Sequence, residues 1–258
     1  MVNGMGKEKS YAERFKNGYD ILCRTKSNYR VWDDVIHLYA YSLANGIMNL
    51  LKSSEPFKSI WEEREDRYLS IINTYSKREQ KVIVQMFALL AMEYEMNPYQ
   101  DLLGRIYMML GINQKNKSQF FTSYDVSKLM AEVLTTREHM SKFIRKQGYA
   151  SVCDECCGAG SMLIAFAEKC SEMFKKHDYR NHVYFVGQDI DELSALMCYI
   201  QLTLIGLPGY VCIGDTLKES QVKDLHRVYF TPAYLNDVWT MRRIMHGLNL
   251  FMEKAKNE

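Results

Sequence analysis

One short segment, residues 150–161, constrains the fold of this chain more than any other. An apolar run ends at Asp154 and is followed by a loop of small residues that contains Gly158 and Gly160. Ser161 then opens an amphipathic stretch. This order predicts a strand, a tight turn and a helix. Glycines lack a Cβ, so the backbone can turn sharply and a ligand can approach it closely, while the helix points free N–H groups at that ligand.

Two more strands are predicted downstream, and each leads into an acid. The run 182–187 leads into Asp189, and the run 210–213 leads into Asp215. In a parallel sheet the C-terminal ends of neighbouring strands form one crevice, where ligands bind. We therefore expect the two acids and Asp154 to lie together. An acid that follows the second strand of such a unit accepts hydrogen bonds from ribose hydroxyls.

A different role is open for acids at these positions, because Asp is also a preferred helix N-cap. We expect that role for Asp191.

The glycine spacing excludes one class of ligand site. A dinucleotide site takes a third glycine in the G-x-G-x-x-G pattern, and that position holds Leu163 here. The turn is therefore not typical of NAD or FAD binding.

Several motifs together resemble DNA adenine-N6 methyltransferases, especially the modification subunits of type I restriction systems. Residues 154–161 look like the loop of that family that binds S-adenosylmethionine. Residues 119–130 resemble the segment that closes over the methionine end of the cofactor, and residues 101–107 resemble its lead-in. The strand ends 187–191 and 214–217 look like the ribose and adenine contacts. The resemblance covers about Trp32 to Leu217 and depends on the order and spacing of all these motifs.

The resemblance implies a cofactor, S-adenosyl-L-methionine, and DNA as a partner, contacted directly or through a specificity subunit. It also implies a class I, Rossmann-like parallel sheet. In the family, the position of Ser123 is usually proline, and serine also caps a helix. The cofactor-binding residues that the resemblance implies are Phe121, Thr122, Asp154, Cys156, Gly158, Gly160, Asp189, Ile190, Asp215 and Thr216.

The upstream half of the chain has a helical pattern. Apolar residues recur at three- and four-residue steps in 31–51, 60–75, 78–96 and 101–110. We therefore predict a helical N-terminal subdomain over 1–112 and a methyltransferase-like Rossmann domain over 113–258. The aromatic and methionine stripes of the first part indicate core packing.

The first thirty residues are more basic than the rest. They hold seven basic and three acidic residues, a net charge of +4, whereas the whole chain has +2. Aromatic residues interleave with the charges, among them Phe15 and Tyr19. Such a segment either lies along a phosphate backbone or forms a solvated leading helix.

Composition favours a cytoplasmic protein without a membrane partner. There is no run of eighteen apolar residues and no apolar signal core at the N-terminus. The seven cysteines are an odd number, and most fall in strand or helix patterns, which is typical of buried thiols in a reducing compartment. Cys153, Cys156 and Cys157 have no second Cys/His pair at ligand spacing, so a metal site is not favoured.

The end of the chain departs from the family pattern. The family carries Asn or Asp, then Pro-Pro and an aromatic residue, after its fourth strand, and this motif holds the flipped target base. Here a short strand is predicted over 228–230, with Thr231, Pro232, Ala233 and Tyr234 after it. The Thr231 hydroxyl is a poor replacement for a carbonyl acceptor. We expect the sheet to be truncated after about the fourth strand, with its far edge covered by the terminal helix or by a partner.

Three functions stay open from the sequence. The first is a DNA adenine-N6 methyltransferase of restriction-modification or mobile-element type that needs a partner or a homodimer for its base pocket. The second is a catalytically inactive regulatory or decoy subunit that keeps the methyltransferase fold. The third is a methyltransferase that acts on RNA or a small molecule.

Overall fold

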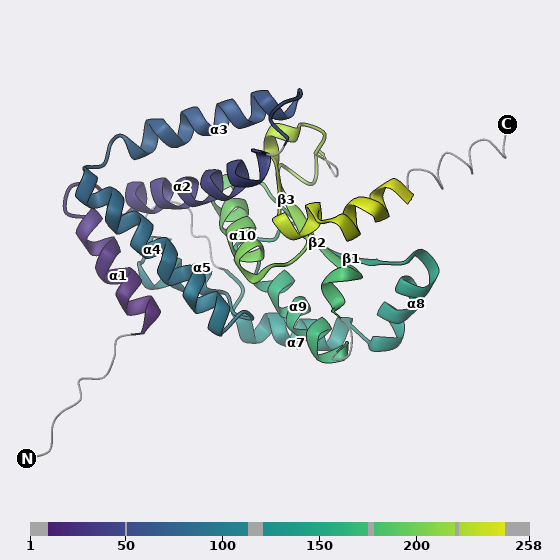
Figure 1. Ribbon diagram of the computed structural model, residues 1–258. Coiled ribbons are helices and arrows are strands. Elements are labelled where there is room, and N and C mark those ends of the chain that lie inside the picture. The colour runs from purple at the N-terminus through teal and green to yellow at the C-terminus, as the bar shows by residue number, and fades with distance from the viewer. Residues whose placement is uncertain (1–9, 50, 113–120, 175–177, 220–221, 246–258) are drawn as a thin grey trace, which may run out of the picture.

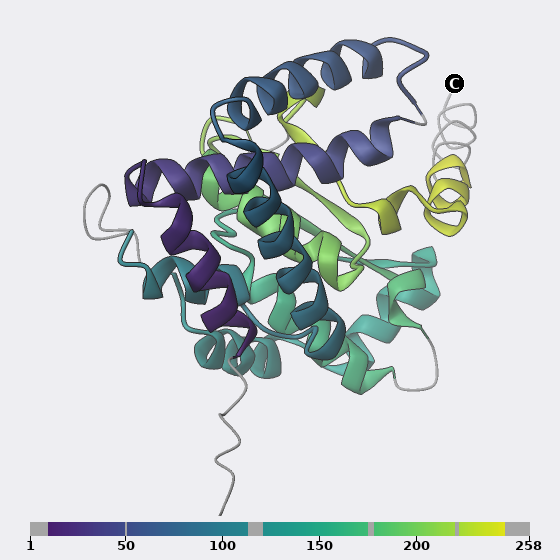
Figure 2. The same ribbon diagram turned by 60° about the vertical axis from the view of Figure 1, so that its left-hand side comes forward.

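The computed structural model describes residues 10–49, 51–112, 121–174, 178–219 and 222–245. A four-stranded sheet lies at the centre, with helices from the N-terminal half packed over one side of it (Figures 1 and 2). The start of the predicted segment 119–130 and the last part of the predicted terminal helix lie outside the described residues, within 113–120 and 246–258.

The sheet has the order β1-β2-β3-β4. Its strands are β1 (Ala150–Asp154), β2 (Val183–Asp189), β3 (Gly209–Ile213) and β4 (Val228–Phe230). β1 pairs with β2 and β2 with β3 in parallel, as the sequence predicts. The registers align Asp154 with Gly187, and Asp189 with Ile213. The C-terminal ends of three consecutive strands therefore lie along one edge of the sheet.

β4 departs from a purely parallel sheet, because it runs antiparallel to β3. Tyr210 pairs with Phe230, and Cys212 pairs with Val228. No α-helix lies between β3 and β4 in the described residues there, and η2 (Leu225–Arg227) leads straight into β4. A connection without a helical crossover favours an antiparallel return. The sheet is therefore a short Rossmann-like unit with one antiparallel edge strand.

Two helices connect the parallel strands. They are α9 (Ser161–Met173) and α10 (Glu192–Ile205). α10 is buried almost all round, because it packs on β2 and β3 on one side and on α2 on the other. Asp191 caps it, accepting the N–H of Ser194 at 3.0 Å, as predicted. α7 (Tyr124–Leu134) lies against α9, and α8 (Arg137–Gln147) leads into β1.

The N-terminal half is helical, as predicted. Its helices are α1 (Tyr11–Leu22), α2 (Asn28–Met48), α3 (Phe57–Ile72), α4 (Lys77–Met96) and α5 (Leu102–Met109). One buried core runs from Phe15 through α2 and α10 to Tyr229. The division at residue 112 therefore stays a prediction, and the two parts share a single apolar interior.

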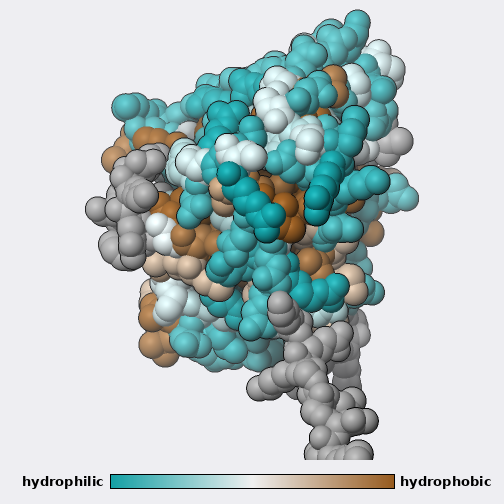
Figure 3. All heavy atoms as spheres, turned by 90° about the vertical axis from the view of Figure 1, so that its left-hand side faces the viewer, coloured by the Kyte–Doolittle hydropathy of each residue, from teal (hydrophilic) through white to brown (hydrophobic). Residues whose placement is uncertain are grey.

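The aromatic residues of α1 face this interior. Phe15 and Tyr19 are buried, and both rings pack edge-on against Trp32, at centroid distances of 6.4 and 6.1 Å. These two rings are therefore core residues and are unavailable for stacking on nucleic acid. Contact of the basic residues of this segment with a phosphate backbone stays a prediction. The outward face of this part of the molecule is mostly hydrophilic, with hydrophobic patches between charged side chains (Figure 3).

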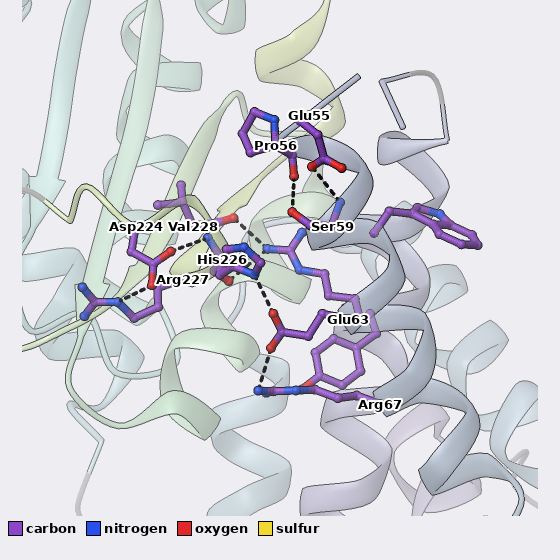
Figure 4. Close-up of polar contacts among 12 residues, drawn as sticks. Glu55, Pro56, Ser59, Glu63, Arg67, Asp224, His226, Arg227 and Val228 are labelled. Carbon is purple, nitrogen blue, oxygen red and sulfur yellow. Dashed lines mark hydrogen bonds and ion pairs between the residues drawn. The ribbon is translucent and has the colours of Figure 1, made fainter. Parts of the chain in front are cut away.

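Helix α3 packs at the β4 edge of the sheet. Thr240 and Arg243 of the helix after Asn236 line a cavity there with Val228 and Phe230, and coverage of this edge by the terminal helix or a partner stays a prediction. Arg64 is buried, and its Nη2 donates to the carbonyl oxygens of Val228 at 2.9 Å and His226 at 3.3 Å. Its guanidinium carbon lies 4.1 Å from the Tyr229 ring centroid. Beside it, Glu63 bridges His226 and Arg67 (Figure 4). Backbone groups of an edge strand need such partners to prevent unwanted pairing.

Thr231 has a structural role at the end of the sheet where β3 begins, opposite the end that carries the strand-end acids. Its side chain is fully buried, and Oγ1 donates to the carbonyl of Leu207 at 2.7 Å and accepts the N–H of Gly209 at 3.0 Å. Gly209 is the first residue of β3, whereas the acids lie at or after the last residues of their strands. The segment from Thr231 to Tyr234 therefore lies away from the strand-end acids and does not replace the family's Asn/Asp-Pro-Pro motif beside them.

Among the described residues, no helix is both long and apolar enough to cross a bilayer.

We predict that Thr231→Val lowers the free energy of unfolding by about 1–3 kcal/mol, because it leaves the Gly209 N–H and the Leu207 carbonyl without their buried partner. Urea denaturation measures this change. Thr240→Val is the matched control, because that hydroxyl makes only exposed contacts, donating to the carbonyl of Leu235 at 3.4 Å and accepting from Arg243 at 2.9 Å, and it should change stability by less than about 0.5 kcal/mol. Equal effects of the two substitutions would contradict the buried role of Thr231.

Candidate functional site

The glycine loop adopts a backbone that requires glycine. Gly158 has φ +52° and Gly160 has φ +97°, both in the left-handed region. A Cβ on Gly158 would lie 3.1 Å from the Phe121 ring, and one on Gly160 would lie 2.8 Å from the Cys198 sulfur. The loop is thus enclosed on both sides, and Gly160 is the N-cap of α9.

Asp189 holds this loop to the end of β2. Its Oδ2 accepts the N–H of Gly158 at 2.8 Å, and its Oδ1 accepts the N–H of Asp191 at 2.9 Å. Its backbone carbonyl accepts the N–H of Gly214, at the end of β3, at 2.9 Å. Only 9% of the residue is exposed. One residue therefore links the glycine loop, the start of α10 and the third strand end.

Asp154 lies half-buried at the tip of β1. Its Oδ1 accepts the N–H of Cys156 at 3.1 Å. Burial raises the pKa of the Asp154 carboxyl, and the neighbouring negative charges of Asp189 and Glu155 raise it further, against the lowering effect of the Cys156 hydrogen bond. Two acids thus lie close enough to repel each other, and such a site favours a ligand that brings positive charge.

The segment after β3 completes the group of strand-end acids. The Thr216 hydroxyl donates to the carbonyl of Glu155 at 2.8 Å, which ties the segment after β3 to the loop after β1. Asp215 accepts the N–H of Leu217 at 3.1 Å and pairs with Lys218 at 3.2 Å, with its side chain 26% exposed. The three strand-end acids predicted from the sequence therefore lie at one edge, around the glycine loop.

The remaining predicted residues surround this group. Phe121 lies over Gly158 and packs against Tyr107, with ring centroids 5.3 Å apart. Thr122 and Cys156 are exposed. Ile190 is 69% exposed although it directly follows the buried Asp189. An exposed apolar side chain beside a group of acids is suited to pack against a flat ring.

Two supporting contacts were missed from the sequence. Gln201 is fully buried in α10, and its amide donates to the carbonyl of Ala159 at 2.6 Å and to Asp101 at 2.9 Å. The Ser127 and Ser161 hydroxyls hydrogen-bond at 2.8 Å, joining α7 to the first turn of α9. For Gln201 the sequence offered one signal, a polar residue within an otherwise apolar helix. The serine pair gave no signal, because it joins two segments far apart in sequence.

Comparisons with known proteins identify a family and relatives of this chain. The family model described as N-6 DNA Methylase matches residues 99–255, which is more than half of the chain and includes every strand. The chain is 24% identical over 152 residues to the type I restriction enzyme MjaIX methylase subunit of Methanocaldococcus jannaschii. It is 32% identical over 76 residues to the MjaVII methylase subunit of the same organism.

These matches are partial in length. They cover 56% and 28% of this chain, and 25% and 12% of the two relatives, so the chain spans about a quarter or less of each.

Two solved structures are also similar. A protein from Listeria monocytogenes, described as a class I S-adenosylmethionine-dependent methyltransferase, has 15% identity and a TM-score of 0.44, over 80% of this chain and 53% of that one. A type I restriction-modification methyltransferase subunit from Streptococcus thermophilus has 14% identity and a TM-score of 0.40, over 83% and 60%.

We predict that Gly160→Ala destabilises the protein by about 1–3 kcal/mol, since the new Cβ collides with the Cys198 sulfur at a backbone angle that alanine rarely adopts. Chemical denaturation of the ligand-free protein tests this. Gly46→Ala is the control of opposite sign. Gly46 lies inside α2, and a Cβ added there would have nothing within 4 Å, so alanine should stabilise by about 0.5–1 kcal/mol. A neutral Gly160→Ala would mean that the loop is not enclosed.

Proposed function

From the premise that the chain belongs to the N-6 DNA methylase family, we propose that it binds S-adenosylmethionine at the C-terminal edge of β1, β2 and β3. We further propose that it acts in adenine-N6 methylation of DNA together with another polypeptide, which supplies the corner that holds the target base. A specificity subunit is the partner that its type I relatives suggest.

The observation that carries the cofactor proposal is the convergence on Asp189. Its carboxylate and carbonyl bring Gly158 and Gly214 together, so a glycine loop and three acids lie at the same end of the three parallel strands. Each carboxylate oxygen of Asp189 accepts one backbone N–H from the described residues and has a second lone pair. That spare capacity suits the ribose hydroxyls of a nucleoside.

The donor set also fits the charged end of the cofactor. Asp154 accepts a single N–H through Oδ1 in the described residues, and its raised pKa reflects a surplus of negative charge that an ammonium group relieves. Ile190 offers an exposed apolar side chain beside the ribose position, and Phe121 shields the loop. When bound, the cofactor supplies an electrophilic methyl group on sulfur. The chain's own residues bind and orient it, so their contribution is positioning and charge placement.

The need for a partner follows from the position of Thr231. This residue is buried at the start of β3, at the end of the strands away from the acids, and its three side-chain hydrogen bonds all go to the backbone there. The described residues after β4 thus place no Asn or Asp followed by proline beside the strand-end acids. The same observation favours a second candidate function, a cofactor-binding subunit that regulates a methyltransferase without methylating DNA itself.

We predict that Asp154→Asn stabilises the ligand-free protein at pH 7 and weakens cofactor binding. Asparagine keeps an oxygen acceptor for the Cys156 N–H and removes the charge that burial penalises. A folded-state pKa above the unfolded value means that the ionised carboxylate destabilises the fold above that pKa, and that this cost disappears as pH falls below the unfolded value near about 3.9. The stability difference between variant and wild type should therefore shrink on acidification to about pH 4.

Differential scanning fluorimetry measures both effects. Wild-type protein at about 100-fold the Kd of S-adenosylmethionine should gain about 2.7 kcal/mol of apparent stability, and Asp154→Asn should gain clearly less. Asp178→Asn, which removes a carboxylate from the N-cap of η1 (Tyr179–Asn181), controls for general charge effects. A full ligand-induced shift in Asp154→Asn would remove this residue from the site.

The DNA activity is tested with S-adenosylmethionine carrying a labelled methyl group. We expect label on adenine N6 only when the chain is combined with a type I specificity subunit and its methylation partner, and none from the chain alone. Gly158→Val should abolish the label. Label transferred by the purified chain alone would contradict the need for a partner, and cofactor binding without label in any combination would favour the regulatory subunit.

A further inference from the structure

The two edges of the sheet differ in how their backbone groups are satisfied. At the β4 edge, Arg64 of α3 donates to the carbonyl oxygens of Val228 and His226. β1, at the other edge, has five residues in unbroken register with β2 and contains no lysine, proline or bulge. Natural proteins use such devices to keep an exposed edge from pairing with other chains. β1 is therefore the unprotected edge of the described sheet.

The outward backbone groups of β1 belong to Ser151 and Cys153. The Ala150 N–H donates to the carbonyl of His182, which precedes β2, at 2.8 Å. In a parallel ladder alternate residues face the same neighbour, so Ser151 and Cys153 direct their N–H and C=O groups away from β2. Both residues are exposed, and these backbone groups have no partner among the described residues. The edge thus offers two donors and two acceptors at the spacing of an extended chain.

A groove of about 480 Å³ runs along this edge. Every residue of β1 lines it, and α8, α9 and the end of α7 form its other walls. α8 lies beside β1, on the side away from β2 (Figure 1). The helical walls present apolar side chains, which include Met140 and Phe143 on α8 and Met162 and Phe166 on α9. An extended peptide fits such a groove, because its backbone pairs with the strand edge and its alternate side chains meet the apolar walls.

The charges on α8 indicate what accompanies the apolar side chains of such a peptide. Lys142 and Lys146 are exposed, and neither has an ion-pair partner among the described residues. They follow the groove-lining His139 and Phe143 by three residues each, so they lie one helical step from the groove wall. The only acid in the lining is Asp154, at one end. Acidic side chains beside an apolar stretch complement this rim.

We propose that β1 accepts an extended segment of a partner polypeptide, which adds a fifth strand to the four-stranded sheet. Its apolar side chains face α8 and α9 at every second position, because neighbouring side chains of a strand point to opposite faces. Its acidic side chains lie next to Lys142 and Lys146. Assigning this segment to the partner in DNA methylation rests on the proposed function, since the groove ends beside Asp154. The pairing itself requires neither cofactor nor DNA.

The groove favours a free extended segment over a second copy of this chain. In a second copy, β1 has β2 on one side and its own α8 across the groove on the other. That α8 would have to enter the space between β1 and α8 of the first copy. A free segment has no such neighbours and can approach β1 to the usual strand spacing of about 4.8 Å.

A titration of the ¹⁵N-labelled full chain, without cofactor or DNA, tests the proposal. The probe is an acetylated and amidated peptide of about seven residues, with valine and threonine alternating between two terminal glutamates, so that it spans the length of β1. We expect saturable shifts of the Ser151 and Cys153 amides. Hydrogen exchange at both should slow about tenfold when the peptide is at about ten times its Kd. The same peptide with N-methylated valines lacks donors and should bind at least about tenfold more weakly.

Ser151→Pro is the matched change in the protein. It removes an N–H that has no partner among the described residues, so the circular dichroism spectrum and melting temperature should stay as in wild type. The affinity for the peptide should fall at least about tenfold. Ser151→Ala keeps the N–H and should bind the peptide as wild type does.

Three results would overturn the proposal. One is the absence of saturable shifts at Ser151 and Cys153 at millimolar peptide, and another is equal binding of the N-methylated peptide. The third is slow exchange of both amides in the peptide-free protein, because this chain or a second copy would then already occupy the edge. None of these results bears on cofactor binding, so the proposed function and the strand addition fail independently.

Discussion

The bonds between the Asp189 carboxylate and the backbone of two neighbouring segments are the constraint on which the rest of this structure depends. Asp189 ends β2 and is nearly buried, so its charge requires hydrogen-bond donors close by. The donors come from Gly158 and Asp191. The loop after β1 must therefore return over the end of β2, and only a left-handed glycine backbone permits that path. The end of the sheet that forms in this way gathers the negative charge that the proposed cofactor, a cationic nucleoside, requires.

A second constraint explains why this edge is incomplete. Three parallel strands linked by α9 and α10 bring their C-terminal ends together, but β4 returns antiparallel and carries Thr231 to the other edge. β1 pairs only with β2, so it stays an edge strand in the described sheet. The chain thus brings the strand-end acids and the glycine loop together, whereas the described residues after β4 place no base-holding motif beside them. This combination is the physical basis for proposing a subunit that acts with others.

Much of this arrangement was predictable from the sequence, for identifiable reasons. The β1 turn, the acids at the strand ends and the cap at Asp191 all depend on local signals, which are a change of hydrophobic period, small residues and a capping side chain. The helices of the N-terminal half followed from their apolar spacing.

Other features depend on contacts that no local signal records. The direction of β4 is decided by the absence of a helical crossover and by Arg64 on α3, which is 164 residues away from Val228 and satisfies carbonyl groups of the edge strand. Gln201 gave only a weak hint, and the Ser127–Ser161 bond gave none. The order of motifs along the chain suggested that Thr231 would follow a fourth strand at the same end of the sheet as the acids. That expectation was wrong, because the order of motifs does not determine the direction of β4.

The central claim is that one nucleoside cofactor binds at the edge where Gly158, Asp189 and Gly214 meet. A titration of ¹⁵N-labelled protein with S-adenosylmethionine, followed by amide chemical shifts, tests it most directly. The account predicts the largest changes at Gly158, Ile190 and Gly214, with little change in α3 or β4. Saturable changes confined to other segments, or none at millimolar cofactor, would contradict it.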